Sequence, residues 1–166
     1  RIRRNRWDVL GFKNGFSIYD ESDKKALLKR IVKDLKIDEK IYPVSYLGSV
    51  ISSCKEAEED PDDYIENNSM NFKAETVAKV YARYMEDLQQ NNAMDFDDLL
   101  WNAVKLFEAS SEVLSYYQER FKYIMVDEYQ DTNYLQYKLI HALAEKSHNL
   151  CVVGDDDQCI YQWRGA

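Results

Sequence analysis

The chain has 166 residues, of which 45% are hydrophobic and 31% charged, a composition typical of a globular protein. Its formal net charge of −8 argues against a protein that simply coats duplex DNA, because neutralising phosphates requires an excess of Lys and Arg. No run of eighteen apolar residues occurs, so no membrane span is predicted.

The cysteines and the start of the sequence bear on the compartment. Cys54, Cys151 and Cys159 have the spacing of neither a zinc site nor a disulfide framework. No charged-then-apolar leader opens the sequence. These features favour a cytoplasmic protein with reduced thiols. The first residue is Arg1 rather than Met, which indicates a piece of a longer chain.

The first hundred or so residues predict a succession of helices. Asp20 to Asp23 is a helix-start signal, and Pro43 suits the first turn of a second helix. The acidic stretch 56–66 is expected to break that helix and to form a solvated loop or helix end. Apolar stripes predict two more helices, one with Val77, Val80, Tyr81, Tyr84 and Leu88, and one that Asp95 caps, with Phe96, Leu99, Leu100, Ala103, Val104 and Phe107 facing inward.

The pattern changes after a short helix at about 113–118. The apolar runs 123–126 and 150–153 predict two buried strands, separated by a helix that Asp131 or Thr132 caps. A strand, a helix and a second strand are typical of a parallel sheet. The fold class is therefore α/β but mostly α in this fragment, with a helical subdomain at 1–120 and a partial parallel-sheet piece at 121–166. Two strands alone do not make a stable sheet, so further strands are expected outside this chain.

The strongest chemical motif is the strand that ends in Asp127 and Glu128. In open α/β sheets, ligands bind at the carboxyl ends of the strands. One carboxylate there can hold Mg²⁺, usually through water, and the next can orient or deprotonate an attacking water. Alternatively, the two acids could simply cap the next helix.

A second motif follows the second strand, at Gly154 to Gln158, and continues to Ala166. Gln158 can both donate and accept hydrogen bonds. Tyr161, Trp163 and Arg164 form a group of two aromatic rings and a cation, on which unpaired bases can stack. The aromatic residues could instead pack in a core, and the three acids at 155–157 could be a solvated turn or, less favourably, a calcium site.

These motifs resemble those of the UvrD/Rep/PcrA-type superfamily 1 DNA helicases. The segment 126–133 is similar to their motif II, and 153–166 is similar to their motif III. The segment 94–99 resembles an acidic-aromatic signature near the end of their helical 1B subdomain. The resemblance covers nearly the whole chain, with the motifs in order. It implies that 1–120 is a 1B-like subdomain and 121–166 part of the 1A ATP-binding domain.

The resemblance also implies roles for particular residues. Asp127 would bind the Mg²⁺ of Mg-ATP, and Glu128 would be the catalytic carboxylate for the attacking water. Gln158 would sense the γ-phosphate and link it to the DNA site. The three residues expected to contact single-stranded DNA are Tyr161, Trp163 and Arg164. The parent would be a 3′-to-5′ helicase of repair or replication, acting on single strands and single-strand/duplex junctions, with DNA-repair proteins among its partners.

The chain departs from the family pattern in three ways. Cys159 stands where Ser is usual, and Gln162 where Arg is frequent, which weakens a polar contact and a phosphate contact. No Gly-x-x-x-x-Gly-Lys-Ser/Thr phosphate loop occurs in the 166 residues. The isolated chain is therefore expected to be inactive, as a monomer or as a dimer that truncation induces through exposed strand edges.

Two other functions remain open at this point. The helical region could be a DNA- or protein-binding module without catalysis, or the chain could be a degenerate relative kept for structural work. The intact Asp127, Glu128 and Gln158 argue against degeneracy. A phosphate loop encoded upstream of Arg1 would favour the enzyme.

Overall fold

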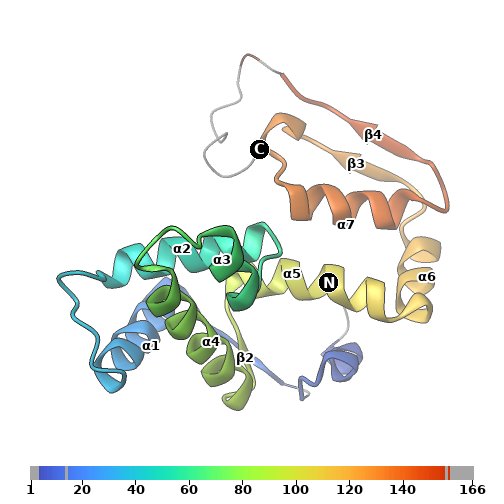
Figure 1. Ribbon diagram of the computed structural model, residues 1–166. Helices are drawn as coiled ribbons and strands as arrows, with labels where there is room; N and C mark the ends of the chain where they lie inside the picture. Colours follow the sequence, from blue (N-terminus) through green and yellow to red (C-terminus); the bar gives the residue numbers. More distant parts are fainter. Residues whose placement is uncertain (1–3, 14, 156, 158–166) are drawn as a thin grey trace. The chain divides into compact units, whose positions relative to one another are not determined.

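Helices dominate the chain in the computed structural model, which describes residues 4–13, 15–155 and 157. Two compact units make up the chain (Figure 1). The helical unit is Gly15–Leu99, and the second unit combines Arg1–Asn14 with Leu100–Ala166. One helix, α5 at Phe96–Ala109, begins in the helical unit and ends in the second unit.

The helical unit contains α1 (Glu21–Asp34), α2 (Val44–Glu56), α3 (Pro61–Asn67) and α4 (Ala74–Gln90). The predicted helix start at Asp20 is confirmed, since its carboxylate accepts hydrogen bonds from the N–H groups of Ser22 and Asp23. The acidic stretch 56–66 was predicted to be a loop or helix end, but part of it forms a helix of its own. Asp60 caps the separate helix α3, which the sequence analysis did not predict. Its seven residues were too few for an apolar period to stand out.

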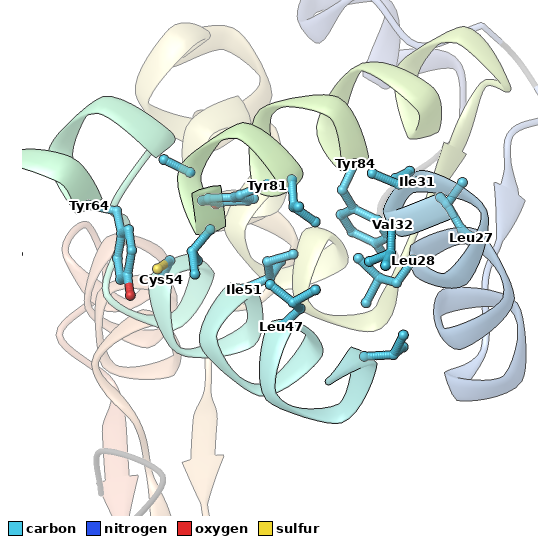
Figure 2. Packing of buried hydrophobic residues seen from close by; sticks show 14 of the residues in the cluster. Leu27, Leu28, Ile31, Val32, Leu47, Ile51, Cys54, Tyr64, Tyr81 and Tyr84 are labelled. Atoms are coloured by element: carbon cyan, nitrogen blue, oxygen red, sulfur yellow. The ribbon is translucent and has the colours of Figure 1, made fainter. Parts of the chain in front are cut away.

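The core of the helical unit lies between α1, α2 and α4 (Figure 2). The side chains of Leu28, Ile31, Leu47, Ile51 and Tyr84 are almost completely buried there. The stripe predicted on α4 faces this core. Burial of one such side chain stabilises the fold by roughly 1.5–3 kcal/mol, so this cluster holds the three helices together.

Two short strands bring the ends of the helical unit together. β1 (Ser17–Ile18) and β2 (Ala93–Met94) pair in parallel, with Ser17 opposite Ala93 and Ile18 opposite Met94. The N–H of Tyr19 continues the ladder by donating to the carbonyl of Met94 at 2.8 Å. The sequence analysis missed this pair, because two-residue strands show no alternation.

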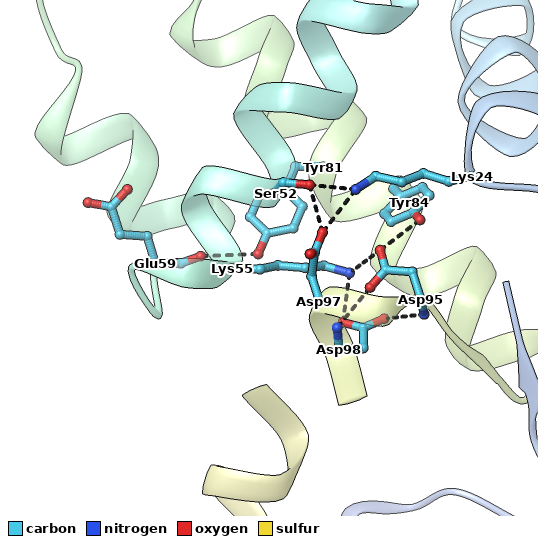
Figure 3. A network of polar contacts seen from close by, with 9 residues as sticks. All are labelled: Lys24, Ser52, Lys55, Glu59, Tyr81, Tyr84, Asp95, Asp97 and Asp98. Atoms are coloured by element: carbon cyan, nitrogen blue, oxygen red, sulfur yellow. Dashed lines mark hydrogen bonds and ion pairs between the residues drawn. The ribbon is translucent and has the colours of Figure 1, made fainter. Parts of the chain in front are cut away.

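A buried polar network fixes the segment that enters α5 (Figure 3). Asp95 and Asp98 bond reciprocally, each accepting from the other's backbone N–H, so the predicted cap at Asp95 is confirmed. The Lys55 ammonium lies 2.8 Å from Asp95 and 2.7 Å from Asp98. Tyr84 donates its hydroxyl hydrogen to Asp95 at 2.9 Å. The first turn of α5 is thus tied to α2 and α4.

The second unit carries the other parallel sheet. Its elements include η1 (Arg4–Leu10), α6 (Ser111–Arg120), β3 (Ile124–Val126), η2 (Tyr129–Asp131), α7 (Tyr134–Ala144) and β4 (Leu150–Val152). β3 and β4 pair in parallel, with Ile124 opposite Leu150 and Val126 opposite Val152. Both predicted strands and the helix between them are confirmed. The predicted fold class, mostly helical with a partial parallel sheet, is confirmed as well.

Three local predictions about burial and capping are wrong. The β3–β4 strands are not buried, since the Met125 side chain is 80% exposed and all of β4 is exposed. Parallel strands are normally covered on both faces, and in the described segment between β3 and β4 the one α-helix is α7. Phe96 is 57% exposed rather than inward. Asn133, not Asp131 or Thr132, caps α7. Among the described residues, no helix is long and apolar enough to cross a membrane.

Candidate nucleotide site at the carboxyl end of the parallel strands

The β3–β4 ladder extends beyond the strands and brings the two predicted motifs together. The N–H of Val153 donates to the carbonyl of Val126 at 2.8 Å, and the N–H of Tyr129 donates to the carbonyl of Val153 at 2.9 Å. Asp127 and Glu128 therefore leave β3 at the same edge at which Gly154 and Asp155 leave β4. This is the edge at which open α/β sheets bind ligands.

The turn after β3 exposes both predicted carboxylates. Glu128 has a left-handed backbone with φ 53° and ψ 43°, which reverses the chain sharply before η2. One oxygen of Asp127 accepts the N–H of Glu128 at 3.0 Å. Because the Asn133 side chain caps α7, neither acid serves as that helix's cap. Asp127 and Glu128 are both exposed, with carboxylate oxygens available to a ligand.

A hollow of about 380 Å³ lies beside this turn. Three carboxylates, those of Asp127, Glu128 and Asp131, line it, together with Val126, Thr132, Gln136, Leu139 and Ile140. One oxygen of Asp131 is buried and has no hydrogen-bond partner among the described residues. A buried acceptor of this kind is usually satisfied by an ordered water. The sequence analysis considered Asp131 only as a helix cap and gave it no place in the site.

Gln130 is a second residue to which the sequence analysis gave no role. Its side-chain amide donates to Glu128 at 2.6 Å and accepts the N–H of Asp155 at 2.9 Å. The only signal in the sequence was its place inside the motif, two residues after Glu128. The contact to Asp155 spans 25 positions and could not be predicted without the sheet pairing.

The remaining predicted site residues belong to the second motif. Gln158, Tyr161, Trp163 and Arg164 lie outside the described residues. The structure describes their motif only as far as Asp155 and Asp157, where the N–H of Asp157 donates to the Asp155 carboxylate at 3.0 Å. Of the predicted residues, the structure thus brings together Asp127 and Glu128.

The donor set fits magnesium held largely by water and phosphate. In the described part of the chain, no group of three or more His, Cys, Asp or Glu side chains is arranged to hold a metal ion by itself. Mg²⁺ commonly takes one or two protein carboxylates and completes its shell with waters and substrate phosphates. Exposed Asp127, which lines the hollow, matches that requirement.

Comparison with known proteins shows the family to which the chain belongs. Residues 1–166 match the family model described as UvrD/REP helicase N-terminal domain. The chain therefore belongs to the UvrD/REP helicase family. It is 46% identical over 167 aligned residues to the ATP-dependent DNA helicase PcrA of Staphylococcus aureus (strain Mu50 / ATCC 700699), and equally so to that of Staphylococcus epidermidis (strain ATCC 12228 / FDA PCI 1200). Each alignment covers 100% of this chain but only 23% of the relative.

Proposed function

We propose that this chain is part of an ATP-dependent DNA helicase that couples Mg-ATP hydrolysis to 3′-to-5′ translocation on single-stranded DNA in repair or replication. The observation that carries the proposal is the pair of exposed carboxylates, Asp127 and Glu128, at the carboxyl end of a parallel strand. The family match and the relatives named as ATP-dependent DNA helicases support the same function.

In this proposal Asp127 and Glu128 have different roles at the γ-phosphate. Asp127 holds Mg²⁺, which when bound neutralises charge that develops on the phosphate oxygens. Glu128 accepts a hydrogen bond from the attacking water, orients it toward phosphorus and takes its proton. The left-handed turn at Glu128 places the two consecutive carboxylates at the hollow that Asp131 also lines.

The second motif would connect the nucleotide to the DNA. Gln158 senses the γ-phosphate, and Tyr161, Trp163 and Arg164 contact the single strand, with Trp163 stacking on a base. This assignment rests on the family resemblance and on the position of Gly154 and Asp155 at the edge that carries Asp127. We expect Gln158→Ala to weaken the stimulation of hydrolysis by DNA more than it weakens DNA binding. Equal loss of basal and stimulated rates would contradict that role.

The isolated chain is proposed to be inactive. No phosphate loop occurs in its 166 residues, so the β- and γ-phosphates lack a backbone cradle and a lysine. We assign 1–120 to a 1B-like subdomain and 121–166 to part of the 1A domain. The exposed β3–β4 sheet could also pair two copies of the isolated chain.

The proposed setting is the cytoplasm, with single-strand/duplex junctions and DNA-repair proteins as partners. Cys54 and Cys151 are both free, and burial raises the pKa of Cys54 to about 12, so its thiol stays protonated.

A second candidate function is a DNA- or protein-binding module without catalysis. That function would not explain the two exposed carboxylates at the edge of the sheet.

Unwinding by the full-length protein tests the proposal. Duplexes with a 3′ or a 5′ single-stranded tail are mixed with the protein, Mg²⁺ and ATP, and strand separation is followed. Separation of the 3′-tailed duplex alone, dependent on both ATP and Mg²⁺, is the expected result. Binding to both duplexes with no separation would favour the binding module, and preference for the 5′ tail would contradict the proposed direction.

A further inference from the structure

The side-chain amide of Gln130 joins the two motifs of the nucleotide site. Its nitrogen donates to Oε2 of Glu128 at 2.6 Å, and its oxygen accepts the backbone N–H of Asp155 at 2.9 Å. Both ends of one amide are thus used, one on the proposed catalytic carboxylate and one on the segment that continues to Gln158. An uncharged amide suits this position, because it carries a donor and an acceptor on one side chain.

Gly154 makes this bridge sterically possible. A Cβ atom at that position would lie 2.7 Å from the side-chain oxygen of Gln130 and 3.3 Å from Cβ of Tyr129. Contacts of 2.7 Å are too short for a carbon atom, so any side chain at 154 would push the Gln130 amide away. The absence of a side chain at Gly154 lets the two segments approach closely enough for the hydrogen bond to Asp155.

The hydrogen bond from Gln130 to Glu128 also lies at a turn whose backbone is constrained. Glu128 occupies the left-handed region, which is unfavourable for a residue other than glycine. Such a backbone persists only where surrounding contacts hold it. The Gln130 amide on its carboxylate and the 2.9 Å bond between the N–H of Asp131 and the Glu128 carbonyl are two of those contacts. Losing the amide would free the Glu128 side chain to rotate away.

We infer that Gln130 is a positioning residue that orients the Glu128 carboxylate and couples it to the backbone at Gly154 and Asp155. The inference rests on the proposed function, because it takes Glu128 to be the carboxylate that orients the attacking water. A displacement of the segment after β4 then moves the Asp155 amide, the Gln130 side chain and the Glu128 carboxylate together. Gln130 would therefore transmit a change on the second motif to the hydrolytic step.

Two substitutions of Gln130 distinguish its hydrogen bond to Glu128 from its hydrogen bond to Asp155. Gln130→Met keeps the length of the side chain and removes both hydrogen bonds. Gln130→Glu keeps an acceptor for Asp155 but sets a carboxylate against Glu128. Gln130 is only partly buried, so neither change opens a core.

The test is steady-state ATP hydrolysis by the full-length protein, with and without a single-stranded oligonucleotide, over a range of ATP concentrations. We expect Gln130→Met to lower the stimulated kcat by at least about tenfold while KM for ATP changes by less than about threefold, because misplacing a catalytic group affects the chemical step. The ratio of stimulated to basal rate should fall as well. Gln130→Glu should be at least as defective, and thermal melting of both variants should match that of wild type.

Each other result overturns either this inference or the proposed function, and Glu128→Gln distinguishes the two. If Glu128→Gln is inactive while Gln130→Met keeps kcat and the stimulation ratio within about twofold of wild type, only the role of Gln130 is overturned. A large rise in KM with unchanged kcat would make Gln130 a nucleotide-binding residue and overturn the inference as well. If Glu128→Gln hydrolyses ATP as fast as wild type, the proposed function fails first, and the positioning role falls with it.

Discussion

The ammonium nitrogen of Lys55 lies 2.8 Å from Oδ2 of Asp95, and both side chains are buried in the helical unit. The two residues are 40 positions apart, on α2 and at the start of α5. Burial alone would raise the pKa of the Asp95 carboxyl, but Lys55 holds it below its usual value. The pair therefore stays ionised, and it fixes the entry to the helix that continues into the second unit.

Loss of the lysine should destabilise the fold strongly. Lys55→Met leaves Asp95 and Asp98 buried without their cation, and removal of one partner of a buried pair costs about 3–5 kcal/mol. Urea unfolding of the chain, followed by far-ultraviolet circular dichroism, measures the loss. Lys146→Ala is the control, because Lys146 and its partner Glu119 are exposed. A midpoint for Lys55→Met that equals the control's would contradict the network's structural role.

The two buried tyrosines of α4 offer a matched comparison. Tyr84 donates to the charged Asp95 at 2.9 Å, whereas Tyr81 donates to the backbone carbonyl of Glu59 at 3.1 Å. Burial, followed by the Asp95 charge, raises the pKa of Tyr84, so its hydroxyl remains a donor. We expect Tyr84→Phe to cost about 1.5–3 kcal/mol and Tyr81→Phe about 0.5–1.5 kcal/mol in urea unfolding. The reverse order would show that the charge on Asp95 does not strengthen the bond.

Asp87 should make the stability of the helical unit depend on acid pH. Burial acts to raise the pKa of Asp87, but hydrogen bonds from Arg83 and Arg30 outweigh it and lower the pKa below its ordinary value. A carboxyl with a lowered folded-state pKa stabilises the fold above its unfolded pKa, and this contribution is lost as the pH falls through the folded value. Urea midpoints of wild type and Asp87→Asn should therefore converge below about pH 4. A constant difference from pH 7 to pH 3 would refute the assignment.

A methyl group at position 154 should disturb the site without unfolding the chain. The Cβ of Gly154→Ala would lie 2.7 Å from the Gln130 side-chain oxygen, so the bridge from Glu128 to Asp155 must break or shift. We expect DNA-stimulated ATP hydrolysis by the full-length protein to fall at least about tenfold. Gly48→Ala is a suitable control, because its Cβ would meet only Leu28 at an ordinary 3.4 Å. Equal activity of the two variants would count against the close approach at Gly154.

The sequence predicted the helix caps at Asp20 and Asp95, the apolar stripe of α4 and the strand before Asp127, because each depends on residues that are close together in the chain. Helix caps at Asp20 and Asp95 are encoded within a few residues, as is the apolar stripe of α4, and all are confirmed. The strand before Asp127 is likewise marked by a short apolar run between polar residues. Sequence motifs alone therefore placed Asp127 and Glu128 after β3.

Features that depend on pairing between distant segments could not be predicted. The β1–β2 pair joins Ser17 to Ala93, and its two-residue strands carry no periodic signal. The bond from Gln130 to Asp155 requires the β3–β4 register. The exposure of Met125 was also missed, because an apolar run predicts a strand suited to burial but not whether this chain supplies the cover.

The most direct measurement is ATP hydrolysis by the full-length protein with and without single-stranded DNA, for wild type and Glu128→Gln. The account predicts strong stimulation of wild type by DNA and a loss of at least about 100-fold in the variant, since its amide cannot accept a proton from the attacking water. Thermal melting should be the same for both proteins, because Glu128 is exposed. Stimulated hydrolysis by Glu128→Gln at the wild-type rate would contradict the assignment of the site at the end of β3.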